Sequence, residues 1–125
     1  MMGVHHIGYV VKDIDQYAAN LVEGVIIKRL YDDVQEADLA LIQADNVLIE
    51  LIQPMKESSF TYGFLQKGGG YHHLCYQVDS KGKAEKIIKE KKMVKVLGWV
   101  FAPLLQAMVV FAYSKNKEVV EFVCQ

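Results

Sequence analysis

The stretch Lys67-Gly-Gly-Gly-Tyr-His-His-Leu-Cys-Tyr-Gln-Val78 repeats a pattern that first occurs at Val4-His-His-Ile-Gly-Tyr-Val-Val11. In each copy a histidine doublet is followed by a branched apolar residue, one small residue and a tyrosine, and no histidine lies outside the two doublets. This alternation is typical of a half-buried β-strand. Because side chains alternate between the two faces of a strand, we expect His6 and His73 to lie opposite the branched and aromatic side chains.

A second pair of segments repeats as well. Val47–Gln53 resembles Glu118–Cys124, and each segment carries one glutamate, Glu50 or Glu121, in the middle of an apolar strand. The spacing between the two glutamates is similar to the spacing between His6 and His73. The sequence therefore predicts two copies of one module, each with a histidine near its start and a glutamate near its end.

The remaining periodicity predicts the order β-α-β-β-β in both modules. We expect a single domain over residues 1–125, with module one at about 1–54, a connector at about 55–70 and module two at about 71–125. The expected helices begin at Asp13 and near Asp79 or Ser80, Gly24 ends the first helix, and Ser59–Gln66 is compatible with a short helix. The expected strands after the histidine strands are Val25–Tyr31, Leu39–Ala44, Val47–Ile52, Met93–Phe101, Met108–Ser114 and Glu118–Cys124.

Composition excludes several functional classes. The chain has 125 residues, 52% of them hydrophobic, which is enough for an ordinary core, and its net charge of −1 gives no reason to expect nucleic acid. Two cysteines and the lack of a secretory signal indicate reduced thiols in a cytoplasmic protein. Val96–Ser114 is uncharged and close to the length of a membrane span, but Gly98, Pro103 and Gln106 favour strands, so we expect no membrane segment.

The two histidines and two glutamates form a candidate metal site if the modules pack as a symmetric pair. Two imidazoles and two carboxylates suit one divalent ion such as cobalt, nickel, manganese, zinc or iron(II). Both glutamates have apolar neighbours on their face and no lysine or arginine, and a buried carboxylate has to be neutralised, paired or bound to metal. The alternative is two unrelated half-buried pairs. His5 and His72 are expected to be structural, and Cys75 a small buried apolar residue.

At these residues the chain resembles the vicinal oxygen chelate superfamily, which includes glyoxalase I, methylmalonyl-CoA epimerase, extradiol dioxygenases and fosfomycin-resistance proteins. The resemblance covers nearly the whole chain. It implies an α+β fold in which two βαβββ modules form a curved, cup-like mixed sheet around a metal ion, with helices on the outer face. The metal ligands of the family match His6, Glu50, His73 and Glu121.

Within the superfamily, the additional glutamate Glu50 favours the epimerase and glyoxalase branch. Gly63–Val78 looks much like the connector and second strand of methylmalonyl-CoA epimerases, whereas the apolar segment Ala102–Ala107 departs from their usual polar, glycine-containing segment. The resemblance implies a small-molecule substrate such as an acyl-CoA thioester, and a homodimer. Leu104, Leu105 and Trp99 are expected to leave apolar surface for that dimer.

The first functional hypothesis is a metal-dependent epimerase that moves a proton next to a thioester carbonyl through a metal-stabilised enolate. Glu121 is the expected base, and Asp38 is a candidate for the second acid or base that epimerisation needs. The alternatives are a glyoxalase I-like lactoylglutathione lyase and a non-catalytic protein that binds a small molecule.

Overall fold

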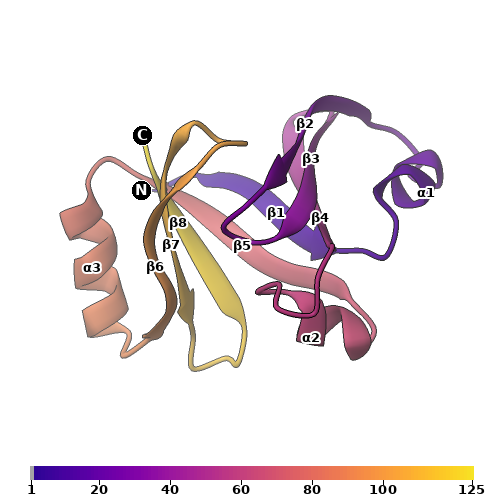
Figure 1. Cartoon of the computed structure of the whole chain (residues 1–125). Coiled ribbons are helices and arrows are strands. Elements are labelled where there is room, and N and C mark those ends of the chain that lie inside the picture. Colours follow the sequence, from indigo (N-terminus) through magenta and orange to yellow (C-terminus); the bar gives the residue numbers. More distant parts are fainter. Residues whose placement is uncertain (1) are drawn as a thin grey trace. The chain divides into compact units, whose positions relative to one another are not determined.

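The computed structural model describes residues 2–125 and contains two copies of β-α-β-β-β joined by a short helix (Figure 1). The elements are β1 Val4–Val10, α1 Ile14–Ala19, β2 Val25–Asp32, β3 Ala37–Ala44, β4 Val47–Pro54, α2 Tyr62–Gln66, β5 Gly70–Val78, α3 Lys81–Glu90, β6 Val94–Ala102, β7 Ala107–Tyr113 and β8 Val119–Cys124. This order confirms the predicted α+β class with two βαβββ modules.

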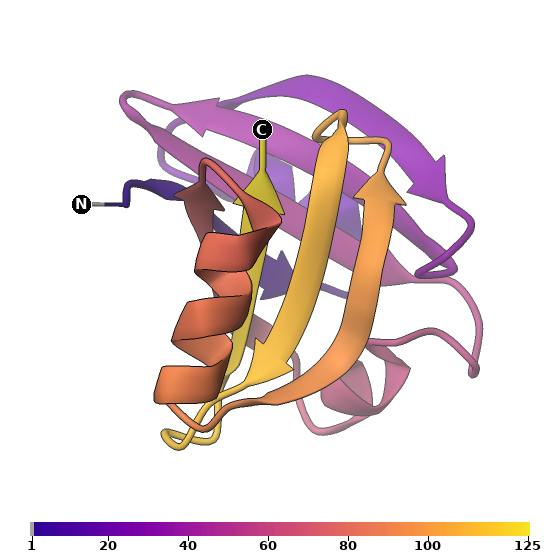
Figure 2. The same cartoon turned by 90° about the vertical axis from the view of Figure 1, so that its left-hand side faces the viewer.

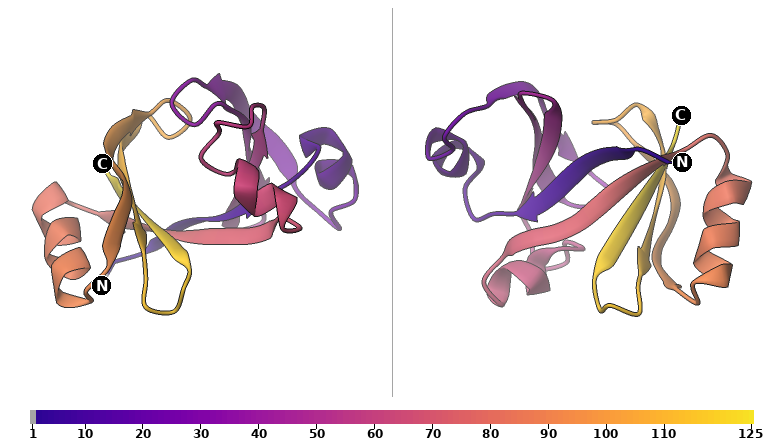
Figure 3. Two further views of the ribbon diagram at one scale, coloured as in Figure 1. Left: turned by 60° about the horizontal axis from the view of Figure 1, so that its bottom comes forward. Right: turned by 180° about the vertical axis from the view of Figure 1, so that it is seen from behind.

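The chain divides into two compact units that differ from the predicted modules. The N-terminal unit is residues 7–72, and the C-terminal unit combines His73–Gln125 with the residues up to His6. The start of the chain joins the second module because the amide of Gln77 in β5 donates to the carbonyl of Gly3 at 2.9 Å. Figure 3 shows these first residues beside β5. The single domain over residues 1–125 stays a prediction.

The sheet of the C-terminal unit has the strand order β5-β8-β7-β6, with β5 and β8 parallel and the other pairs antiparallel. Helix α3 covers one face of it (Figure 2). Ala84 and Ile88 of α3 pack against Val78, Val110 and Phe122 of the strands. The helix begins where the sequence predicted, because the Ser80 side chain accepts from the amide of Lys83 at 3.2 Å.

The sheet of the N-terminal unit has the order β2-β3-β4-β1, with β1 and β4 parallel. Ile14 of α1 is completely buried against a cluster that includes Ala40, Ile42 and Leu51. As predicted, the Asp13 side chain caps α1 by accepting from the amide of Gln16 at 3.0 Å.

Helix α1 is shorter than predicted. It ends at Ala19, where the amide of Asn20 bonds the carbonyls of both Gln16 and Tyr17 and so tightens the last turn. Gly24 lies beyond this turn with a φ of +140°, and a Cβ there would come within 2.8 Å of Ile42 Cγ2. A glycine is therefore required at position 24 by the backbone conformation and close packing at the start of β2, and not by the end of α1.

The uncharged stretch from Val96 to Ser114 forms most of β6 and β7, joined by a turn. None of the helices within residues 2–125 is both long and apolar enough to cross a membrane. The expectation that Leu104 and Leu105 leave apolar surface is wrong, because the turn folds both side chains inward to 2% and 7% exposure. Trp99 is half-buried and donates from Nε1 to Glu85 at 2.7 Å.

Gly69, in the connection between α2 and β5, provides a test of the fold. Its φ is +67°, and an added Cβ would lie 2.7 Å from the Val10 carbonyl oxygen. We expect Gly69→Ala to lower the free energy of unfolding by about 1–3 kcal/mol, measured by urea denaturation. The control is Gly63→Ala in α2, where a Cβ meets nothing within 4 Å. That change is expected to be neutral or to stabilise by up to about 1 kcal/mol; equal losses at both positions would contradict the assigned turn.

Candidate metal centre

Three of the predicted site residues meet inside the C-terminal unit. His6 comes from β1, His73 from β5 and Glu121 from β8. The register of β5 and β8 places Cys75 opposite Glu121, so His73 and Glu121 lie on the face of the sheet that points away from α3. All three side chains are buried, with residue exposures of 1%, 0% and 2%.

The mutual distances among the three donor atoms are short and nearly equal. His6 Nε2 and His73 Nε2 are 3.2 Å apart, and each lies 3.0 Å from Glu121 Oε1. Both distances to Oε1 are those of ion pairs, and no fully aligned hydrogen bond reaches this buried oxygen from the described residues.

This arrangement fits a metal ion better than it fits a closed set of hydrogen bonds. Donor atoms bound about 2.0–2.2 Å from one ion lie roughly 2.8–3.6 Å from each other. The distances among His6, His73 and Glu121 fall inside this range. Two imidazole nitrogens and a carboxylate oxygen also form a ligand set that suits borderline divalent ions. The residues present therefore fit the predicted metal.

The charge of Glu121 also suits a cation. Burial by itself raises the pKa of Glu121, but the imidazoles of His6 and His73 outweigh burial and hold that pKa below its ordinary value. The shift favours the ionised form of Glu121, whose residue exposure is only 2%. An anion of this kind needs a positive charge close to it.

Ring packing fixes the two imidazoles. The His73 ring meets Phe111 edge to face at 5.4 Å between centroids, and the His6 and His73 rings are 5.3 Å apart at 80°. Phe111 is also the β7 residue that pairs with Glu121 in the register of β7 and β8. The same aromatic side chain thus supports one predicted ligand and lies next to another.

The other two predicted site residues belong to the N-terminal unit. Glu50 is 4% exposed and pairs with Gly8 of β1 and with Leu41 of β3. Its part in the ligand set stays a prediction. Asp38 pairs with Gln53, and by strand alternation it shares the face of Ala40, which packs toward α1. Asp38 and Glu50 therefore point to opposite faces of this sheet, and a role for Asp38 as the second acid or base stays a prediction.

The first histidines of the two doublets have different surroundings. His72 lies edge to face with Phe60 and Phe64, at centroid distances of 5.9 and 4.9 Å. His5 instead brings its Nδ1 to 2.8 Å from Nδ1 of His6. Sequence reasoning missed this contact, because strand alternation puts neighbouring side chains on opposite faces.

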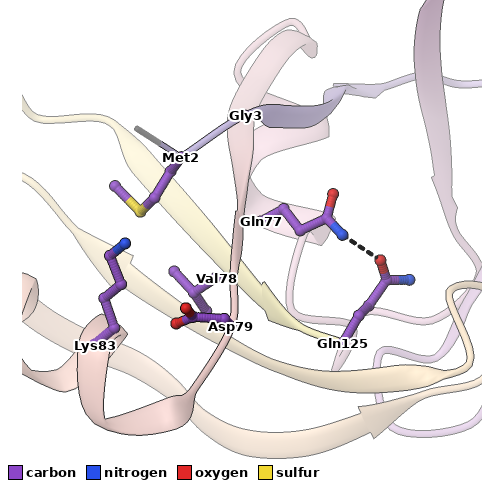
Figure 4. A pocket seen from close by; sticks show the side chains of 7 residues that line it. All are labelled: Met2, Gly3, Gln77, Val78, Asp79, Lys83 and Gln125. Atoms are coloured by element: carbon purple, nitrogen blue, oxygen red, sulfur yellow. Dashed lines mark hydrogen bonds between the residues drawn. The ribbon is translucent and has the colours of Figure 1, made fainter.

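An open cavity elsewhere in the C-terminal unit is not part of this centre. It is lined by Met2, Gly3, Gln77, Val78, Asp79, Lys83 and Gln125 (Figure 4). Gln77 Nε2 donates to Gln125 Oε1 at 2.7 Å across it. None of the predicted metal ligands is among these residues.

The family model of the glyoxalase/bleomycin resistance protein/dioxygenase superfamily matches residues 5–103. The chain belongs to this superfamily. The matched segment includes both histidine doublets and the strand of Glu50, whereas Glu121 lies beyond it.

Relatives by sequence include an ethylmalonyl-CoA/methylmalonyl-CoA epimerase of Cereibacter sphaeroides, 32% identical over 100 residues, covering 76% of this chain and 74% of the relative. The human mitochondrial methylmalonyl-CoA epimerase is 28% identical over 95 residues, covering 72% of this chain. The chain spans only about half of that relative, 54% of its length.

The fold is shared with solved structures over the whole chain. A methylmalonyl-CoA epimerase in complex with methylmalonyl-CoA and NH4+ matches with a TM-score of 0.86, covering 100% of this chain and 95% of that chain. The sequence identity is only 17%, so this likeness concerns the fold. It agrees with the predicted fold class.

The metal centre makes a direct prediction about the second histidine doublet. His73→Ala should weaken binding of a divalent ion by more than about 100-fold, because even outer-shell partners are typically worth about 10- to 100-fold. His72→Ala, the adjacent residue, should leave the affinity unchanged. Titration of the metal-free protein with Zn²⁺ against a chromophoric chelator measures the affinity of each variant. The wild type is expected to bind one ion per chain. Equal losses in the two variants would contradict the assignment of faces.

Proposed function

We propose that the protein is a metal-dependent epimerase that moves a proton on the carbon next to the thioester carbonyl of an acyl-CoA. The observation that carries the proposal is the buried carboxylate of Glu121, whose Oε1 lies 3.0 Å from the Nε2 atoms of both His6 and His73. Support also comes from sequence relatives named as methylmalonyl-CoA epimerases.

We infer that His6, His73 and Glu121 hold the ion, and that Glu50 supplies a fourth ligand. A bound divalent ion supplies Lewis-acid chemistry, which stabilises negative charge on a carbonyl oxygen. The two neutral imidazoles add no charge, and the two carboxylates of Glu50 and Glu121 balance the charge of a divalent ion. Burial of these groups strengthens the electrostatic interactions, because little water screens them. The native ion is one of cobalt, nickel, manganese, zinc or iron in this proposal.

Glu121 is the proposed base. Its carboxylate is ionised at neutral pH because the imidazoles of His6 and His73 lower its pKa. It can therefore accept the proton from the carbon next to the carbonyl, which leaves the electron pair on the substrate as an enolate. Epimerisation then requires protonation from the opposite side of that carbon. Asp38 lies on the face of its sheet opposite Glu50, so we infer that this second proton donor is another group or a water molecule.

One alternative reaction needs no second acid. A glyoxalase I-like lactoylglutathione lyase moves a proton between neighbouring carbons of a hemithioacetal, and one carboxylate on one side of the substrate suffices for that. The superfamily match is compatible with this reaction. A protein that binds a small molecule without chemistry is the remaining alternative.

The two reactions are separated by their substrates. Incubation in D₂O with a panel of acyl-CoA thioesters that carry an acidic α-proton should give enzyme-dependent deuterium uptake at that carbon, measured by mass spectrometry. The matched sample contains the hemithioacetal of methylglyoxal and glutathione. Turnover of the hemithioacetal without exchange in any thioester would exclude the epimerase and favour the lyase.

Glu121→Gln tests the proposed base. The amide keeps an oxygen donor of similar size but cannot accept the proton, so the variant should retain metal at least in part. Loss of one proton-transfer group typically lowers the rate by about 10²- to 10⁴-fold. α-Proton exchange at matched metal loading is the measurement. A metal-loaded Glu121→Gln that exchanges at the wild-type rate would restrict Glu121 to a ligand role.

The homodimer also stays a prediction. The apolar surface available for it differs from the surface expected from the sequence. Leu104 and Leu105 are buried and cannot form the contact. Exposed apolar side chains lie instead on β6, where Val94, Val96 and Phe101 are 65%, 43% and 51% exposed. We infer that any contact between two copies uses this strand.

A further inference from the structure

His6 uses both of its ring nitrogens. Nε2 faces His73 and Glu121, as described above, while Nδ1 lies 2.8 Å from Nδ1 of His5. The two rings meet edge to face, with centroids 5.1 Å apart at 85°. His6 is only 1% exposed, so its Nδ1 has little access to water. The partner of that nitrogen therefore matters for the state of the ring.

A neutral imidazole carries its proton on one nitrogen and a lone pair on the other. If His6 binds a metal ion through Nε2, its proton must be on Nδ1. The contact at 2.8 Å then requires that His6 Nδ1 donates and that His5 Nδ1 accepts. His5 must consequently be neutral, with its own proton on Nε2.

The contact could instead belong to a second metal site, because Cys75 also has its Sγ nearby. One ligand atom from each of His5, His6 and Cys75 lies within 4.8 Å of the others. However, the separation of 2.8 Å between the two Nδ1 atoms lies at the short limit for two ligands of one ion, whereas it is an ordinary hydrogen-bond length. A shared proton fits this pair better than a shared ion.

We propose that His5 is a positioning residue of the metal centre, which keeps the proton of His6 on Nδ1 and the lone pair of Nε2 toward His73 and Glu121. This inference rests on the proposed metal-dependent function. Residues that orient a metal-binding histidine in this way typically contribute about 10- to 100-fold to metal affinity. The corresponding residue of the second doublet, His72, packs against Phe60 and Phe64 and serves as the matched control.

Three substitutions of His5 distinguish the effect of its hydrogen-bond acceptor atom from the effect of its aromatic ring. His5→Asn places an amide oxygen close to the position of Nδ1, His5→Gln places it near the position of Nε2, and His5→Phe keeps a ring without an acceptor. Zn²⁺ affinity by chelator competition should stay within about 3-fold of the wild type for His5→Asn. It should fall about 10- to 100-fold for His5→Phe and His5→Gln. His72→Phe should keep the wild-type affinity.

A second readout does not depend on affinity. Imidazole nitrogen-15 NMR of the zinc-loaded wild type should show His5 as the neutral form with its proton on Nε2. A His5 that carries a proton on Nδ1 would overturn the proposal. So would wild-type affinity in His5→Phe or His5→Gln. A loss of affinity in His5→Asn together with an equal loss in Cys75→Ser would also overturn it, because both residues would then be ligands. A wild-type protein that binds no divalent ion would overturn the proposed function together with this inference.

Discussion

The buried negative charge of Glu121 is the constraint on which the C-terminal unit depends. An isolated carboxylate inside a protein costs several kcal/mol unless other groups compensate its charge. Two imidazoles provide part of that compensation, since they hold the pKa of Glu121 below its ordinary value despite burial. The missing hydrogen bond to Oε1 leaves the rest to a cation. We therefore propose that these side chains are metal ligands and that the free energy of the site is lowest when an ion is bound.

Strand pairing, helix packing and the start of the chain together position the side chains around Glu121. Parallel pairing of β5 and β8 brings His73 and Glu121 to the same face. Helix α3 covers the other face through Ile88 and Ala84, so the apolar core of this unit and the candidate metal ligands lie on opposite sides of the sheet. The first residues of the chain join β5 through the Gly3 carbonyl, and this places His6 in the same unit as its partners.

Much of this could be predicted from local patterns. Strand alternation is a property of each strand alone, and it correctly placed His73 and Glu121 away from the helix. The position of Asp38 could also have been derived, because the tight turn at Asp45 fixes the register of β3 and β4. The contact between His5 and His6 could not, since it depends on ring orientations and not on the strand period.

Similarity to solved structures identifies the fold, whereas the donor atoms of the site indicate the chemistry. A TM-score of 0.86 at 17% identity means that the fold is retained while most side chains differ. A fold shared by many activities does not identify a substrate. The donor atoms carry the functional argument instead, because they are few, buried and close together.

X-ray absorption at the zinc edge of the zinc-loaded protein tests the central claim most directly. We expect a first shell of nitrogen and oxygen only, at about 2.0–2.2 Å, with the outer-shell scattering of two imidazoles. A sulfur neighbour at about 2.3 Å would place the ion at Cys75. A shell without imidazole scattering would remove it from His6 and His73, and either result would contradict the metal centre described here.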